Sequence, residues 1–256
     1  MASRFSFYTK KAHRYLGVFI GVQFLLWTIG GFYFSWTEIR EIRGEHLVRE
    51  AEPLDQNAEL VAPSGVIAEL REAGKLHSLR SVSLTGVLGR PYYQIGFENG
   101  SGAQETLLAD ALTGEPREHF SADEALEIAN ARLLKPSNVA GTELLTPGNV
   151  GGHHEYRDKP LPAYAITYEE PAGLVVYVSK VTGNVESVRT TPWRVFDLFW
   201  LFHTLDLYGR DNINNWVLRI FSALGLVTIF SGYVLFAITS PWLRKRRGRN
   251  VEKSDQ

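Results

Sequence analysis

Two long apolar segments lie near the ends of the chain, and a polar region with short alternating patterns separates them. Residues 15–36 (YLGVFIGVQFLLWTIGGFYFSW) carry no charge, and residues 216–238 (WVLRIFSALGLVTIFSGYVLFAI) carry only Arg219, close to their start. A helix needs about 20 apolar residues to cross a hydrocarbon core of roughly 30 Å. The pattern therefore predicts two transmembrane helices. No small-residue cleavage site follows the first, which favours a retained anchor over a signal peptide.

Basic residues outside these segments predict how the chain is oriented. Five follow the second segment, within residues 244–249, and four precede the first: Arg4, Lys10, Lys11 and Arg14. Cytoplasmic flanks of membrane helices are enriched in Lys and Arg. We therefore expect residues 1–14 and the basic tail 239–256 in the cytoplasm of a bacterium. Both spans then lie in its inner membrane, and residues 37–215 lie in the periplasm.

Small residues recur at helix-packing spacing in both segments. Gly17 and Gly21 form a GxxxG pair in the first, and Gly225, Thr228 and Gly232 share one face of the second. Such faces let helices approach closely in lipid. The two spans are expected to pack on each other or on a second copy of the chain.

The region between the spans contains a weak internal repeat, after a linker at residues 37–61. Both copies, residues 62–119 and 120–190, begin with a helical pattern and continue with alternating apolar positions. Each ends in a strand, a Thr-Gly pair and a short continuation, with Thr113-Gly114 and Thr182-Gly183 at corresponding points. Glycine supplies the positive φ that a tight turn requires. Each copy therefore predicts a helix and three antiparallel strands, which makes the chain an α+β membrane protein.

The second copy carries the clearer local signals. Ser121 and Glu124 have the spacing of a capping box, in which each side chain accepts a hydrogen bond from the other residue's backbone N–H at a helix start. Residues 163–170 (AYAITYEE) alternate between apolar and polar positions, as a half-buried strand does.

Composition narrows the chemistry. The 256 residues include no cysteine, which excludes disulfides, iron–sulfur clusters, zinc–thiolate sites and cysteine nucleophiles. A net charge of −1 argues against a nucleic-acid binder. The repeats contain no nucleophile elbow, phosphate loop or paired carboxylates. The sequence therefore leans against an enzyme without deciding the question.

Three stretches of the chain resemble a known family. The second copy, SADEALEIA…YAITYEEPAGLVVYVSKVTGNVESV, is similar to a PepSY domain, and PLPAYAITY (160–168) fits that pattern. The two ends, AHRYLGVFIGVQFLLWTIGG and WLFHTLDLYGRDNINNWVLRIFSALGLVTIFSG, resemble PepSY-associated membrane-helix proteins. The likeness covers nearly the whole chain and implies two transmembrane helices around tandem periplasmic PepSY modules.

The resemblance also implies two kinds of function. Some members resemble iron-uptake or siderophore-reducing membrane proteins that carry haem b on histidines. Other PepSY proteins are thought to restrain peptidases or to assist their folding. This chain departs from the larger reductase-like members because it has two predicted spans rather than four or more.

Three histidines are candidate haem ligands under this resemblance. His13 precedes the first span, His46 follows it, and His203 lies in an apolar helix expected at residues 193–209. A span of roughly 30 Å separates His13 from His203, so one iron cannot bind both within one chain. In a dimer each could pair with its own copy, and His46 is another partner for His203. The alternative for His13 is an interfacial polar residue.

The helix expected at residues 193–209 is apolar on nearly every side but too short to span a membrane. We expect it at the membrane surface, or wedged between the membrane and the PepSY module. A buried His203 needs a hydrogen-bond partner. Asp206, one turn on, could fix its tautomer as a carboxylate does for a metal-bound histidine. The same contact, or one with a loop carbonyl, suits a purely structural histidine.

The stretch GGHHEYRD (151–158) is a candidate metal site. His153, His154 and Glu155 are metal-ligand types, and a glycine-rich loop permits adjacent residues to reach one ion. The alternative is a solvated loop before the following strand.

These patterns favour a membrane-anchored periplasmic protein, accessory to iron or haem handling or to envelope electron transfer, with haem b as its candidate cofactor. One alternative is a cofactor-free PepSY module that regulates a peptidase or another envelope partner. Another is an assembly subunit of a membrane complex. The expected partners are the lipid bilayer and a membrane protein or second copy, with no nucleic acid.

Overall fold

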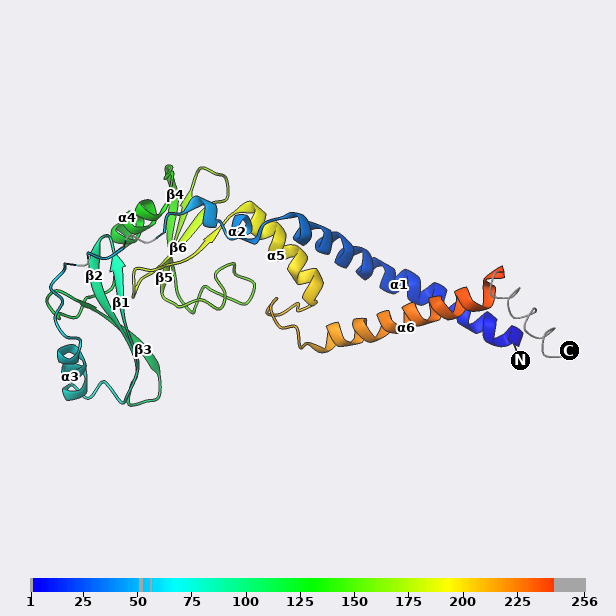
Figure 1. Cartoon of the computed structure of the whole chain (residues 1–256), viewed down its shortest axis with the longest axis horizontal. Helices are drawn as coiled ribbons and strands as arrows, with labels where there is room; N and C mark the ends of the chain where they lie inside the picture. Colours follow the sequence, from blue (N-terminus) through cyan, green and yellow to red (C-terminus); the bar gives the residue numbers. More distant parts are fainter. Residues whose placement is uncertain (1, 51–52, 56, 242–256) are drawn as a thin grey trace. The chain divides into compact units, whose positions relative to one another are not determined.

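The computed structural model describes residues 2–50, 53–55 and 57–241, so the basic run at 244–249 lies outside the described residues. The chain forms two compact units (Figure 1): residues 37–195 form one, and the segments on either side of them form the other. The first unit mixes helices with antiparallel sheets, and the second is helical. The α+β class and the two long apolar helices expected from the hydropathy pattern are therefore present.

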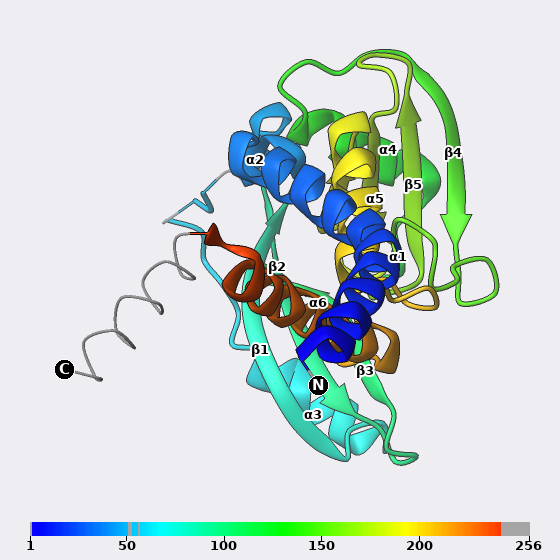
Figure 2. The same ribbon diagram turned by 90° about the vertical axis from the view of Figure 1, so that its right-hand side faces the viewer.

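The α+β unit opens with α2 (Ile39–Ile42) and the 3-10 turn η1 (Glu45–Leu47), within the predicted linker. The first repeat follows as a helix and a three-stranded antiparallel sheet in the order β1-β2-β3. Its elements are α3 (Ser64–Glu72), β1 (Ser78–Val87), β2 (Arg90–Glu98) and β3 (Gln104–Asp110). Figures 1 and 2 show α3 lying against this sheet near one end.

The second repeat has the same order and one more strand. Its helix starts at the predicted capping box, where Ser121 Oγ accepts the Glu124 N–H and the Glu124 carboxylate accepts the Ser121 N–H. The strands form an antiparallel sheet in the order β4-β5-β6-β7. The elements are α4 (Ala122–Arg132), β4 (Val139–Leu145), β5 (Ala163–Tyr168), β6 (Val175–Ser179) and β7 (Val185–Arg189).

Irregularities in the two sheets coincide, which supports the internal repeat. The first strand of each copy carries one bulge, between Leu79 and Ser81 in β1 and between Val139 and Gly141 in β4. The bulges face Phe97 near the end of β2 and Tyr168 at the end of β5. A bulge bends and twists a strand at a fixed place, so the two sheets share their distortion as well as their order.

The two Thr-Gly turns have the same backbone hydrogen bond. The Gly114 N–H donates to the Asp110 carbonyl at 2.8 Å, and the Gly183 N–H donates to the Ser179 carbonyl at 2.9 Å. Both glycines have positive φ, 82° and 69°. The predicted role of glycine at these two turns is therefore confirmed.

Each helix covers the same face of its own sheet. In the first repeat α3 packs on alternate residues of β2, namely Tyr93, Ile95 and Phe97. In the second repeat α4 packs on the equivalent residues of β5, namely Tyr164, Ile166 and Tyr168. Because side chains alternate between the faces of a strand, a shift of one residue in either strand would turn these apolar side chains away from the helix. Burial of this face therefore specifies the register in both sheets.

The opposite face of the second sheet is covered by the segment between β4 and β5. Residues 146–162 fold over it, and Tyr156 from this segment is fully buried with its ring stacked 4.7 Å from that of Tyr177. In the first repeat Leu88 and Gly89 alone join the two strands, both with positive φ as a tight hairpin requires. The first sheet therefore lacks an equivalent cover from its own repeat.

The helical unit contains α1 (Ala2–Trp36), α6 (Trp216–Thr239) and most of α5 (Thr191–Thr204). Both α1, over residues 7–36, and α6 are long and apolar enough to cross a membrane. They lie side by side in Figures 1 and 2, and the rings of Phe19 and Phe221 are 5.5 Å apart.

The small-residue face predicted for the second span is confirmed. A Cβ on Gly225 would lie 3.1 Å from the Phe24 ring, and one on Gly232 would lie 3.2 Å from the His13 ring. In contrast, a Cβ on Gly17 or Gly21 would meet no atom within 4 Å among the described residues. The GxxxG face of α1 therefore does not contact α6, and its packing on a second copy stays a prediction.

The helix expected at residues 193–209 is shorter at its end than predicted. It stops at Thr204 because Leu205 adopts a φ of 52°, outside the helical region. Its last turn lies against α1, where Gln23 Nε2 donates to the Phe202 carbonyl at 2.7 Å. Trp27 Nε1 donates to the Phe202 and His203 carbonyls at 3.1 and 3.2 Å. These side chains satisfy carbonyls that a helix end leaves without intrahelical partners.

Candidate functional site

A cleft of about 810 Å³ lies between the two repeats of the α+β unit. One wall is the face of the first sheet that α3 does not cover, and the other is the turn after β6 together with the end of segment 146–162. Most lining side chains are polar, among them Ser81, Gln94, Thr106, His119, Thr182 and Glu186. Such a lining offers hydrogen bonds to a polar ligand, alongside apolar surface from Phe97, Leu161 and Val181.

Segment 146–162 contributes Pro160 and Leu161 to the cleft and is held in place by its own buried tyrosine. The Tyr156 hydroxyl donates to the Pro160 carbonyl at 2.7 Å. Burial also raises the pKa of Tyr156 above its ordinary range, with a further contribution from the Glu186 carboxylate. The hydroxyl therefore stays protonated as a donor.

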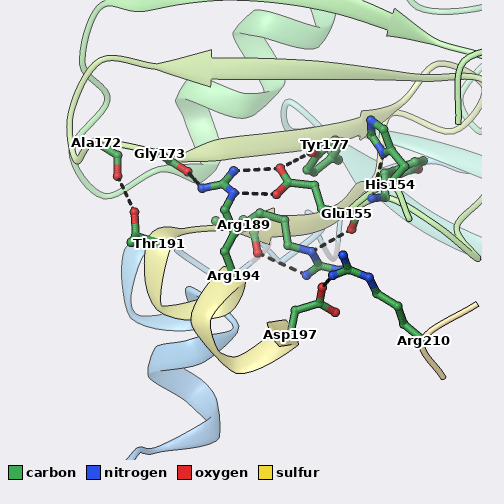
Figure 3. A network of polar contacts seen from close by, with 12 residues as sticks. His154, Glu155, Ala172, Gly173, Tyr177, Arg189, Thr191, Arg194, Asp197 and Arg210 are labelled. Carbon is green, nitrogen blue, oxygen red and sulfur yellow. Dashed lines mark hydrogen bonds and ion pairs between the residues drawn. The ribbon is translucent and has the colours of Figure 1, made fainter. Parts of the chain in front are cut away.

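A network around Glu155 fixes this segment to the sheet and to the first turn of α5 (Figure 3). The carboxylate accepts Arg194 Nε and Nη2 at 2.8 and 2.9 Å, a two-pronged ion pair. It also accepts the Tyr177 hydroxyl at 2.6 Å. Burial, followed by this hydrogen bond, raises the pKa of Tyr177 above its usual range. The sequence indicates Glu155 only as a candidate metal ligand and predicts no role for Arg194 or Tyr177.

A glycine makes room for the arginine of this network. Arg194 Nη1 donates to the Gly173 carbonyl at 2.6 Å, and Gly173 has a φ of 81°. A Cβ at Gly173 would lie 2.8 Å from Arg194 Nη1 and 2.9 Å from Thr191 Oγ1. Glycine is therefore required here by conformation and by space.

A second arginine reinforces the same region. Arg189 Nε donates to the Glu155 carbonyl at 3.1 Å, and its guanidinium lies 4.1 Å from the centre of the Trp193 ring. A cation over an indole face is attracted by the negative charge of the π system. The beginning of α5 is thereby attached to β7 as well as to segment 146–162.

The electrostatics of the cleft are mixed in sign. Glu186 lines the cleft, and burial raises the pKa of its carboxyl, an effect that the nearby Lys159 opposes. Arg80 also lines the cleft and forms an ion pair with Glu98. Glu105 adds a second carboxylate to the lining, so the cleft carries a slight excess of acidic side chains.

The residues predicted as a metal site lie in segment 146–162 but have other contacts. His154 Nδ1 accepts the Tyr156 N–H at 3.0 Å, His153 is exposed, and Glu155 binds Arg194. Within residues 2–50, 53–55 and 57–241, no three His, Asp or Glu side chains form a group that could hold a metal ion. Metal binding by His153, His154 and Glu155 stays a prediction, and it would have to compete with the partly buried ion pair between Glu155 and Arg194.

His13 is half-buried between α1 and α6. Its Nδ1 lies 2.7 Å from Ser231 Oγ, and that hydroxyl donates its proton to the Thr228 carbonyl at 2.8 Å. Since a hydroxyl has one proton to donate, it accepts from His13, which places the imidazole proton on Nδ1. A neutral His13 therefore keeps a free lone pair on Nε2, as an iron ligand requires.

His203 is exposed at the end of α5, with its ring stacked 6.0 Å from that of Trp200. It also lies beside Trp27, which is fourteen residues beyond His13 on α1. At 1.5 Å per residue, this places His13 and His203 about 21 Å apart along the helix, too far to share an iron. His46 is exposed in the α+β unit.

The predicted partnership of His203 with Asp206 is not what the structure describes. The Asp206 carboxylate accepts the backbone N–H groups of Tyr208, Gly209 and Asn212, at 3.0 to 3.3 Å. The backbone hydrogen bond from Asn212, helped by the others, lowers the pKa of Asp206. Asp206 therefore organises the turn between α5 and α6. The sequence signal was its place before a Gly and an Asn, typical of an aspartate-stabilised turn.

Sequence reasoning also missed a buried ion pair in the helical unit. Asp197 lies inside the apolar α5, and its carboxylate pairs with Arg210 of the following turn. Asp197 is 4% exposed, and an isolated carboxylate so buried would be costly. The pair explains how an apolar helix tolerates an acidic residue.

Comparison with known proteins finds no matching family model, no matching curated protein and no matching solved structure.

Proposed function

We propose that this protein is a membrane-anchored accessory protein whose α+β unit acts as a binding module outside the cytoplasm. The observation that carries the proposal is the apolar surface of α1 and α6. In the most apolar stretches of α1 and α6, only 17% and 11% of the residues are buried within the chain. Exposed apolar helices of this length need lipid or another protein around them.

We further propose that the termini lie in the cytoplasm of a bacterium and the α+β unit in its periplasm. Lys10, Lys11 and Arg14 in the first half of α1 support this orientation through the excess of basic residues on the cytoplasmic side. The repeated helix-and-sheet unit supports kinship with PepSY modules. The cleft lined mostly by polar side chains supports a binding role.

Alkaline carbonate extraction tests the anchoring. The full chain is expected to stay in the membrane pellet and to require detergent for release. Release by carbonate would contradict a transmembrane anchor and would make α1 and α6 a surface for another protein.

His13 supports haem b as a second candidate function. An apolar groove of about 430 Å³ lies along α6 beside it, lined by Ile229, Gly232, Tyr233 and Phe236. The groove and the free Nε2 fit one axial ligand of a haem. Within the described part of the helical unit, His203 lies too far along α1 to be the second, so a second copy of the chain would supply it. When bound, haem would provide one-electron chemistry.

An absorption spectrum of detergent-purified protein from haem-replete cells tests this candidate. A Soret band at one haem per two chains, lost in His13→Gln and kept in His203→Gln, would support it. A featureless spectrum from folded protein would remove haem and leave the binding module. Ser231→Ala serves as a milder variant, because it frees the His13 ring without removing the imidazole.

A further inference from the structure

The two repeats differ at one sheet edge, and the difference leaves a vacant strand position. In the second repeat β7 pairs along β6 from Val178 back to Val175. In the first repeat the corresponding chain after the Thr-Gly turn makes one bridge, between Ala109 and Pro116. It then leaves the sheet and runs to Phe120 in the core of the second repeat. The outer edge of β3 is therefore occupied at its end and open at its beginning.

The backbone of the open part faces outward. On the two sides of the bridge, the Leu108 carbonyl accepts the Arg117 N–H at 2.7 Å and the Asp110 N–H donates to the Glu115 carbonyl at 2.9 Å. Backbone groups alternate in direction along a strand, so those of Gln104 and Thr106 point to the same side. Among the described residues no strand pairs with them, and both residues are exposed.

The vacant edge borders the cleft between the repeats. The side chains of Gln104 and Thr106 line it, together with Ser81, Gln94 and Gly96 from the same face of the sheet. A strand added to β3 would thus run along one side of the cleft. Its alternate side chains would enter the cleft, and the others would lie on the α3 side.

We propose that β3 binds an extended segment of a partner polypeptide, which takes the place that β7 occupies in the second repeat. The existing bridge at Pro116 starts the ladder that the guest continues. In the second repeat Val188 pairs with Val176 and is buried under α4. The equivalent guest residue pairs with Leu107, a partly buried residue beside α3. The guest therefore carries an apolar residue there, and its next residue, opposite Thr106, is polar and faces the cleft.

This inference rests on the proposed binding-module function and gives its ligand a class. Main-chain hydrogen bonds along an open edge would supply affinity, and alternate side-chain positions would supply selectivity. Among the described residues, no strand pairs with the outer edge of β1 in the first repeat or of β4 in the second, so these edges do not distinguish the copies. The edge of β3 does distinguish them, because the equivalent edge in the second repeat, that of β6, is paired with β7.

The test uses full-length protein in detergent and a fluorescent peptide with the sequence of residues 188–191, VRTT, which matches the open part of β3 from Leu107 back to Gln104. Thr106→Pro removes the outward N–H of β3 while leaving the bonds to β2, since proline is tolerated where an edge N–H faces out. The control is Thr142→Pro, an exposed threonine of the edge strand β4. Its N–H also faces outward, because its neighbours Gly141 and Glu143 carry the bonds to β5.

The account predicts saturable binding to the wild type, measured by fluorescence anisotropy. The peptide should bind Thr106→Pro at least about tenfold more weakly, because a ladder bond is lost and a ring obstructs the edge. It should bind Thr142→Pro as it binds the wild type. A peptide methylated on alternate backbone nitrogens should not bind. Equal binding to both variants, or none to the wild type up to about 1 mM, would overturn the inference. Membrane extraction reads the anchoring separately, so a failure here would leave that proposal standing.

Discussion

At the scale of single residues, burial decides how the tyrosines of the α+β unit behave. Tyr168 is 1% exposed, and its hydroxyl donates to Asn130 Oδ1 at 2.8 Å. Burial raises its pKa to about 12, because the phenolate would lose its hydration. Burial also raises the pKa of Tyr156 and of Tyr177. Each therefore folds as a neutral group and would have to be deprotonated against its surroundings at high pH.

The stability of the unit should consequently fall in alkali. The folded pKa of Tyr168 lies above the ordinary value near 10, so its contribution is complete below pH 10 and is lost as the pH rises toward 12. The free energy of unfolding should drop by up to about 1.4 kcal/mol per pH unit for each such tyrosine. Urea unfolding followed by circular dichroism measures it. Tyr168→Phe should be less stable near pH 8 but should show a shallower decline, whereas the exposed Tyr208→Phe should follow the wild type. An unchanged slope in Tyr168→Phe would refute this assignment.

At the scale of elements, the repeats were predictable where local signals suffice. The capping box at Ser121 and Glu124, the alternating strands and the Thr-Gly turns each depend on neighbours in sequence. The fourth strand of the second repeat, β7, follows the Thr-Gly turn as the chain does in the first repeat. Its pairing along β6 depends on contacts across the whole sheet, so the local sequence does not predict it. The contacts of Glu155 could not be predicted. Its partners Tyr177 and Arg194 are 22 and 39 residues away, and no local pattern announces them.

The two equivalent turns should differ in their tolerance of alanine. Gly114 and Gly183 both have positive φ, so alanine at either should cost about 1–2 kcal/mol of unfolding free energy. A Cβ on Gly183 would also lie 2.8 Å from the Phe120 ring, whereas one on Gly114 would come no closer than 3.5 Å to Val61. We expect Gly183→Ala to be the more destabilising by about 1 kcal/mol or more. The same urea titration compares the pair, and equal losses would argue against a tighter second turn.

At the scale of the whole molecule, the α+β unit is an insertion between two apolar helices that pack on each other. The hydropathy pattern predicted both helices, and the glycine face of α6 was foreseen. The predicted pairing of His203 with Asp206 is wrong. The Asp206 carboxylate instead accepts backbone N–H groups of the turn that follows it. Sequence spacing predicts which side chains are neighbours only within a helix. This helix ends at Thr204, before Asp206, so the spacing of His203 and Asp206 does not predict a contact.

The central claim is that α1 and α6 cross a membrane and leave the α+β unit on the side away from the termini. The chain has no cysteine, so single cysteines can report this in intact cells. Ser101→Cys lies in the exposed turn between β2 and β3, and Lys10→Cys lies in the first half of α1. With a thiol reagent that does not cross the inner membrane, the account predicts labelling of Ser101→Cys in intact cells and of Lys10→Cys only after lysis. Labelling of Lys10→Cys alone in intact cells, or of neither before lysis, would contradict it.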